Sequence, residues 1–130
     1  MLVIVSNRFG IKDVNSNYFP VIKRYMKLDS FVGLVGGKPR FAYYFVGHTE
    51  RPAGLEPATK GKRDESDRLI FLDPHYVNPQ LDPEVAYEVG SRHFHCTEYA
   101  ARSIHMSELD PCLSFGFLIE SQEQYERFVD

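Results

Sequence analysis

The chain has few cysteines, no excess of basic residues and no long hydrophobic run, and each shortage excludes a class of protein. The 2 cysteines in 130 residues lack a secretory signal before them, because the apolar start at residues 1–5 is too short and has no cationic lead. They therefore indicate free thiols in a reducing, cytoplasmic compartment. With 15 basic against 18 acidic residues, the formal net charge of -3 gives no electrostatic case for nucleic acid. No apolar stretch approaches the roughly 20 residues of a membrane-spanning helix.

The composition suits one small folded domain. Hydrophobic residues make up 43% of the chain and aromatic residues 14%, which is enough for a packed core and argues against disorder. The length of 130 residues also matches a single domain.

Hydrophobic patterns divide this domain into several strands and a few helices. Strands are predicted at residues 2–6, 31–35, 40–46, 69–72, 92–96 and 113–119. The first and fourth of these are continuous apolar runs, so we expect both to be covered on both faces. Helices are predicted at residues 17–27, at residues 100–109 and after a capping box that begins at Ser121. A largely antiparallel sheet flanked by helices follows from this order.

Residues 49–68 contain prolines, glycines and a cluster of charged side chains. This composition predicts a long surface loop, inserted between two antiparallel strands. The chain then continues into the apolar run at residues 69–72.

An acid and a histidine follow that run, two residues apart. Asp73 and His75 flank Pro74, and in an extended strand side chains at i and i+2 point to the same face. The carboxylate of Asp73 would then reach the near nitrogen of the His75 imidazole. Such a contact fixes the tautomer of the ring and supports its protonated form, as a general base beside a nucleophile requires. The alternative is a strand that ends in an Asp-Pro turn, with His75 merely exposed.

A glycine pair separates the second and third predicted strands. Gly36 and Gly37 precede Lys38 and Pro39, and glycine tolerates a positive φ. The joint is therefore predicted to be a turn or a mobile flap.

Taken in order, these segments resemble the second half of the catalytic domain of the autophagins, the papain-like cysteine peptidases that process the ubiquitin-like modifier of autophagy. The two motifs that carry the resemblance are Gly-Gly-Lys-Pro at residues 36–39 and Leu-Asp-Pro-His at residues 72–75. The resemblance implies that Asp73 and His75 complete a catalytic triad. It also implies that a loop gates the active-site cleft, with Phe41 shielding the closed site; its residues are Gly36, Gly37, Lys38, Pro39, Arg40 and Phe41. An ordinary hairpin turn is the alternative for this loop.

The resemblance places the nucleophilic cysteine of the family upstream of residue 1, at the start of a helix. Cys96 corresponds to a recurring cysteine that is not the nucleophile, and Cys112 follows an Asp-Pro pair without a known role. Cys96 is disfavoured as a nucleophile because no predicted helix N-terminus around it lowers its pKa. The chain alone is therefore expected to be inactive.

Histidines near Cys96 raise the possibility of a zinc site, since histidine and cysteine are zinc ligands. The candidates His93, His95, Cys96 and His105 do not have the spacing of a recognised zinc motif. His95 and Cys96 are sequence neighbours, so on a strand they would face opposite sides. Core and surface roles are favoured, and no metal is expected.

We therefore predict an α/β (α+β) chain in which residues 1–130 form the C-terminal part of a papain-like catalytic domain. By resemblance, the function is cysteine endopeptidase action on the C-terminus of a ubiquitin-like autophagy modifier, with release of that modifier from its lipid. The expected partner is this modifier, free and lipid-conjugated, and a lipid-conjugated substrate would bring the protein to a membrane surface. No cofactor and no nucleic acid are expected. The alternative, from another functional class, is a non-catalytic remnant or a module that binds the modifier.

Overall fold

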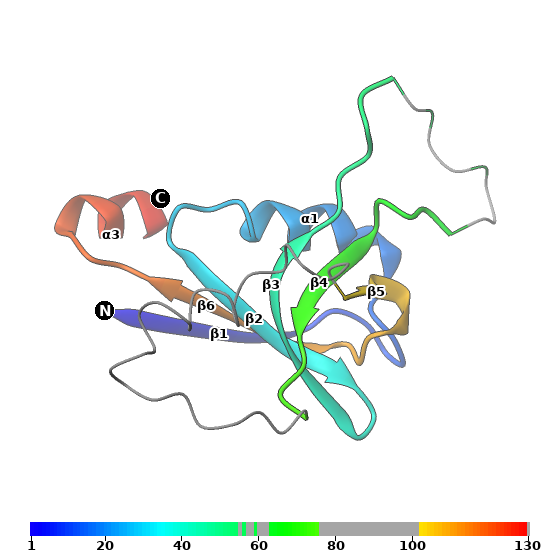
Figure 1. Ribbon diagram of the computed structural model, residues 1–130. Coiled ribbons are helices and arrows are strands. Elements are labelled where there is room, and N and C mark those ends of the chain that lie inside the picture. Colours follow the sequence, from blue (N-terminus) through cyan, green and yellow to red (C-terminus); the bar gives the residue numbers. More distant parts are fainter. Residues whose placement is uncertain (55, 57–58, 60–62, 76–101, 130) are drawn as a thin grey trace, which may run out of the picture.

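A six-stranded antiparallel sheet organises the described part of the chain (Figure 1). The computed structural model describes residues 1–54, 56, 59, 63–75 and 102–129. The strands are β1 (Leu2–Arg8), β2 (Phe31–Lys38), β3 (Phe41–His48), β4 (Arg68–Leu72), β5 (Ser103–His105) and β6 (Cys112–Leu118). Their order in the sheet is β1-β6-β2-β3-β4-β5, which confirms the predicted antiparallel architecture.

Two helices lie over the same face of this sheet, as Figure 1 shows. Helix α1 (Phe19–Tyr25) follows a 3-10 turn at Ser16–Tyr18, and it carries Pro20 in its first turn, where no backbone donor is lost. Helix α3 (Gln122–Val129) begins after Ser121, whose hydroxyl accepts a hydrogen bond from the backbone of Gln124, as the predicted capping box requires. None of the helices in the described ranges is both long and apolar enough to cross a membrane.

The face beneath the helices carries the hydrophobic core. One row of paired residues crosses five strands, from the β1 edge towards β4, and consists of Val5, Phe115, Leu34, Phe45 and Phe71. The three middle members are buried almost completely. Because cross-strand neighbours on one face contact each other directly, this row ties the strands into one packed layer.

The opposite face of the sheet has no covering element among the described residues. The adjacent row consists of Ser6, Ser114, Val35, Tyr44 and Leu72, and Val35 and Tyr44 are 51% and 39% exposed. The prediction that residues 2–6 are covered on both faces is therefore wrong for the described structure, whereas in the strand at residues 69–72 Leu69 is fully buried and the other three residues are half-buried. Strand β1 is an edge strand and is mostly exposed, which its local hydrophobic pattern does not reveal.

The joint between β2 and β3 differs from the predicted glycine turn. Gly36 and Gly37 both lie within β2, and the turn consists of Pro39 and Arg40. A side chain on Gly37 would overlap the carbonyl oxygen of Phe41, so this glycine serves the close approach of two backbones. Positive φ occurs instead at Arg40, with φ of 73°, in the third position of the turn, where a type II turn favours glycine.

The helix predicted at residues 100–109 is also wrong where the structure describes it. Ser103–His105 form strand β5, and Met106–Glu108 form a 3-10 turn. Pairing with β4, with Ile104 opposite Leu69, supplies backbone hydrogen bonds that an isolated short helix would lack. The strand predicted at residues 92–96 lies outside the described residues.

The backbone at Arg40 generates a prediction about stability. A side chain in the left-handed region costs roughly 1–2 kcal/mol, so Arg40→Gly should raise the free energy of unfolding by about 1 kcal/mol after the entropy cost of glycine is deducted. Urea denaturation of the chain measures this change. Lys12→Gly, at an exposed loop position without positive φ, is the control and should give no gain. Equal or lower stability of the Arg40 variant would contradict the assigned backbone strain.

Candidate active site

Asp73 and His75 meet in a turn at the end of β4. One carboxylate oxygen, Asp73 Oδ1, accepts a hydrogen bond from the backbone N–H of His75 at 3.0 Å and lies 2.7 Å from Nδ1 of the same residue. A carboxylate that bonds the backbone two residues ahead forms an Asx turn. The predicted contact is thus present, although strand β4 ends at Leu72 and the two residues do not share an extended strand.

This geometry fixes the role of each imidazole nitrogen. An ionised carboxylate only accepts hydrogen bonds, so Nδ1 of His75 carries the proton and donates it to Asp73. In the neutral ring Nε2 then has a free lone pair, which is the atom that a general base uses. The His75 side chain is 43% exposed whereas that of Asp73 is 16% exposed, so the carboxylate is held in the protein and the imidazole remains accessible.

The surroundings of Asp73 keep its carboxyl group ionised. The backbone N–H of His75 makes the largest contribution to lowering the pKa of Asp73, and desolvation opposes it. The His75 side chain and the charge of Arg102 lower this pKa further; Nη1 of Arg102 lies 3.6 Å from Asp73 Oδ2. The acid is therefore suited to orienting His75 without taking up its proton.

The β2–β3 hairpin brings part of the predicted gating loop to this site. The ring of Phe41 packs edge-on against His75 with centroids 5.6 Å apart, and Lys38 Nζ lies 5.8 Å from the Phe41 centroid. Tyr43 also contacts His75, at 6.2 Å between ring centroids. Sequence reasoning missed Tyr43, although its i+2 spacing from Phe41 on a strand places both rings on one face.

The described cysteine is far from this histidine. Cys112 begins β6 and is exposed, and β2 and β3 separate β6 from β4 in the sheet. With neighbouring strands about 4.8 Å apart, β6 and β4 lie about 14 Å apart. Cys112 therefore cannot act as the nucleophile for His75, and Cys96 lies outside the described residues.

A zinc site finds no support in the part of the chain that the structure describes. No group of three or more potential ligands occurs there. Of the candidates, His93, His95 and Cys96 lie outside the described residues. His105 is buried, and its Nδ1 accepts a hydrogen bond from the backbone N–H of Ser107 at 3.2 Å, so this nitrogen is already satisfied.

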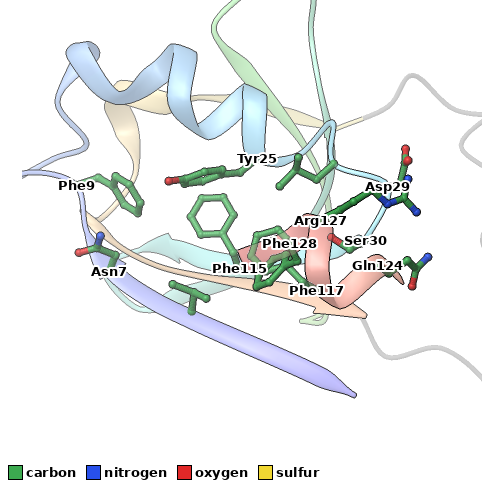
Figure 2. Close-up of a pocket in the computed structure, with 12 residues that line it drawn as sticks. Asn7, Phe9, Tyr25, Asp29, Ser30, Phe115, Phe117, Gln124, Arg127 and Phe128 are labelled. Atoms are coloured by element: carbon green, nitrogen blue, oxygen red, sulfur yellow. The ribbon is translucent and has the colours of Figure 1, made fainter. Parts of the chain in front are cut away.

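A cavity of about 440 Å³ lies elsewhere, between α1 and α3 (Figure 2). Its floor is formed by β1 and β6, and aromatic side chains from the sheet and both helices line it, among them Tyr25, Phe115, Phe117 and Phe128. No lining residue comes from β3, β4 or the turn at residues 73–75. This cavity is therefore separate from the candidate active site.

The lowered pKa of Asp73 predicts a pH dependence. A depressed carboxyl pKa stabilises the fold above the ordinary aspartate value of about 3.9, and this contribution is lost as pH falls through the lower pKa of the folded state. A carbon-13 titration of the Asp73 carboxyl should therefore have its midpoint below that value. His75→Ala should move the midpoint only part of the way back, because the backbone N–H remains.

Arg102→Gln is the matched control for this titration, since it removes the weakest of the stated causes and should move the midpoint less than His75→Ala. A midpoint at the ordinary value in the wild-type chain would show that the Asx turn is not formed.

Known proteins place the chain in a family. The Peptidase C54 catalytic domain model matches residues 1–130. Cysteine protease ATG4A of Homo sapiens is 31% identical over 128 residues, which cover 98% of this chain and 28% of that protein. Cysteine protease ATG4 of Pyricularia oryzae is 32% identical over 130 residues, 95% of this chain and 24% of that protein. Cysteine protease ATG4B of Xenopus laevis is 29% identical over 126 residues, which cover 97% of this chain and 28% of that protein.

The chain thus spans about a quarter of the length of these relatives. The match nevertheless covers every element described above, including the turn that carries Asp73 and His75. With its mixed α/β architecture and antiparallel sheet, the chain belongs to the peptidase C54 family of papain-like cysteine proteases.

Proposed function

We propose that this chain supplies the histidine and the aspartate of a cysteine endopeptidase that trims the C-terminus of an autophagy ubiquitin-like modifier. The observation that carries the proposal is the 2.7 Å contact between Asp73 Oδ1 and His75 Nδ1 in a chain that matches the C54 catalytic domain throughout. The names of the relatives, cysteine protease ATG4 and its variants, support a thiol protease and a role in autophagy. The reaction requires no cofactor, because thiolate and imidazole suffice.

The first half of the reaction forms an acyl-enzyme. Nε2 of His75 takes the thiol proton of a cysteine from the rest of the catalytic domain, and the thiolate attacks the carbonyl carbon of the scissile bond. Asp73 stabilises the imidazolium that results without becoming protonated. The tetrahedral intermediate then expels the amine, which receives its proton from His75. A thioester between cysteine and substrate remains.

The second half regenerates the enzyme. His75 takes a proton from water, and the hydroxide attacks the thioester carbonyl. Collapse of this intermediate releases the substrate carboxylate, and the cysteine sulfur recovers its proton from His75. The carbon–nitrogen bond of the substrate has been replaced by a carboxylate and an amine, so no oxidant or reductant is needed.

The same site suits two substrates of one chemical class. The bond after the C-terminal glycine of the modifier and the bond from that glycine to an amine-bearing lipid are both acyl carbon–nitrogen linkages. One Asp–His–Cys arrangement therefore serves processing and release from lipid alike. When the substrate is conjugated to lipid, the enzyme acts on it from the cytoplasmic side. The substrate then brings the enzyme to the membrane surface.

Among the residues that the structure describes, no cysteine lies near His75. Cys112 lies across the sheet from His75, and the family resemblance assigns Cys96 no nucleophilic role. We therefore propose that the nucleophile comes from the part of the catalytic domain that the longer relatives have and this chain does not, and that the chain alone is inactive.

The base assignment predicts a large loss of activity. In a catalytic domain assembled from this chain and the part of a C54 relative that carries the nucleophilic cysteine, His75→Ala should abolish cleavage of a modifier ending in extra residues. Asp73→Ala should lower kcat about 10⁴-fold, as loss of an orienting acid does in serine proteases. His48→Gln is the control, because this histidine sits at the far end of β3. A near-normal kcat/KM for the His75 variant would end the assignment.

The 130-residue chain by itself should not react with an electrophilic probe built on the modifier C-terminus. Neither Cys96 nor Cys112 is expected to become labelled, because a proton acceptor without a nearby thiol activates nothing. Mass spectrometry after incubation measures the outcome, with iodoacetamide as a control for general thiol accessibility. Stoichiometric labelling of either cysteine that His75→Ala removes would show that the nucleophile lies within this chain.

A further inference from the structure

Two aromatic rings from the β2–β3 hairpin hold the His75 imidazole on one side. Phe41 contacts it at 5.6 Å and 66° between ring planes, and Tyr43 at 6.2 Å and 79°. Phe41 and Tyr43 are themselves stacked, with centroids 6.4 Å apart. Edge-to-face contacts of this kind are favourable and depend on orientation, so the two rings favour one plane of the imidazole over others.

The hydrogen bond to Asp73 does not by itself fix that plane. It joins one nitrogen of His75 to one carboxylate oxygen, and the His75 side chain remains 43% exposed. A single bond of this kind sets the tautomer but leaves the ring free to tilt about it. Since general-base catalysis depends on where Nε2 points, a second constraint on the ring matters for the reaction.

Each of the two rings has further contacts that support it. Tyr43 is 7% exposed and packs on Phe71 of β4 with centroids 4.3 Å apart. Phe41 pairs with Lys38 as the closing residue of the hairpin, and the ammonium of Lys38 lies over its ring. Gly37 leaves room for the Phe41 backbone, which a side chain at that position would displace.

We infer that Phe41 and Tyr43 are positioning residues, which set the orientation of the His75 imidazole so that Nε2 faces the incoming thiol. The role of this orientation in catalysis rests on the proposed function, but the orientation itself is a property of this chain. The inference assigns Phe41 a task distinct from shielding the cleft: it acts through His75 and does so without substrate. The tight Pro39–Arg40 turn, with its positive φ at Arg40, then serves to place the Phe41 ring.

The first test measures His75 in the chain itself, without any catalytic partner. Three-bond couplings in isotope-labelled protein give the χ1 and χ2 rotamer populations of His75, and nitrogen-15 shifts give its tautomer. One dominant rotamer is expected in the wild-type chain. Phe41→Leu should produce averaging over two or more χ2 orientations of the ring, while the tautomer, set by the bond to Asp73, stays the same. Phe41→Tyr keeps a ring and should restore the single rotamer.

Tyr44→Leu is the matched control, because Tyr44 follows Tyr43 on β3 and belongs to the row on the opposite face of the sheet. It should leave the His75 rotamer unchanged. Phe41 is 47% exposed, so its substitution should spare the core, and the amide spectrum of β3 verifies that the sheet is intact. An unchanged His75 rotamer in Phe41→Leu, with the sheet intact, would overturn the inference.

The second test measures catalysis in the assembled domain. Phe41→Leu should lower kcat roughly tenfold to a hundredfold, as a small misplacement of a catalytic group does, with little change in KM, and Phe41→Tyr should recover most of it. A change in KM alone would overturn the positioning role and leave Phe41 as a gate. Retained cleavage by His75→Ala would instead refute the proposed function, and the rotamer measurement separates the two failures.

Discussion

Tyr43 and Phe71 are diagonal neighbours on one face of the β3–β4 ladder, with ring centroids 4.3 Å apart, and this contact joins the hydrophobic core to the candidate active site. Phe71 belongs to the core row through its partner Phe45. Tyr43 reaches the other way and contacts His75. Because packed aromatic side chains transmit displacement instead of absorbing it, the position of the histidine follows from the pairing of two strands. A slip of one residue in that pairing would turn Tyr43 to the other face and remove it from the site.

The pair Asp73 and His75 could be predicted from the sequence because the information is local. An acid, a proline and a histidine in succession bring the two side chains together both in an extended strand and in an Asx turn. The predicted contact is therefore correct although the predicted backbone conformation is not. The structure has the turn, in which Asp73 bonds the backbone N–H of His75. This bond also makes the largest contribution to lowering the pKa of Asp73. Local geometry thus gives the acid both its position and its charge.

Features that depend on distant pairing could not be predicted in this way. Strand β1 is at an edge because Leu2 pairs with Leu118 near the other end of the chain, and its run of apolar residues looks the same in a central strand. The glycine pair is ambiguous for a similar reason. Gly36 and Gly37 permit positive φ, but they also permit close packing, and a side chain at either position would overlap Leu113 or the Phe41 backbone. Only the neighbours across the sheet decide between these uses.

The described histidines differ in what their imidazoles can do, and this difference singles out His75. The His48 side chain is 8% exposed, and its Nδ1 lies 3.6 Å from Glu50, too far for a good hydrogen bond. His105 is 4% exposed, and its Nε2 has no hydrogen-bond partner among the described residues, so an incoming group cannot reach it. His75 combines a short bond to a carboxylate with an exposed ring edge. A base that must receive a proton from a thiol on another segment needs both properties, since burial would exclude the thiol and loss of the carboxylate would free the tautomer.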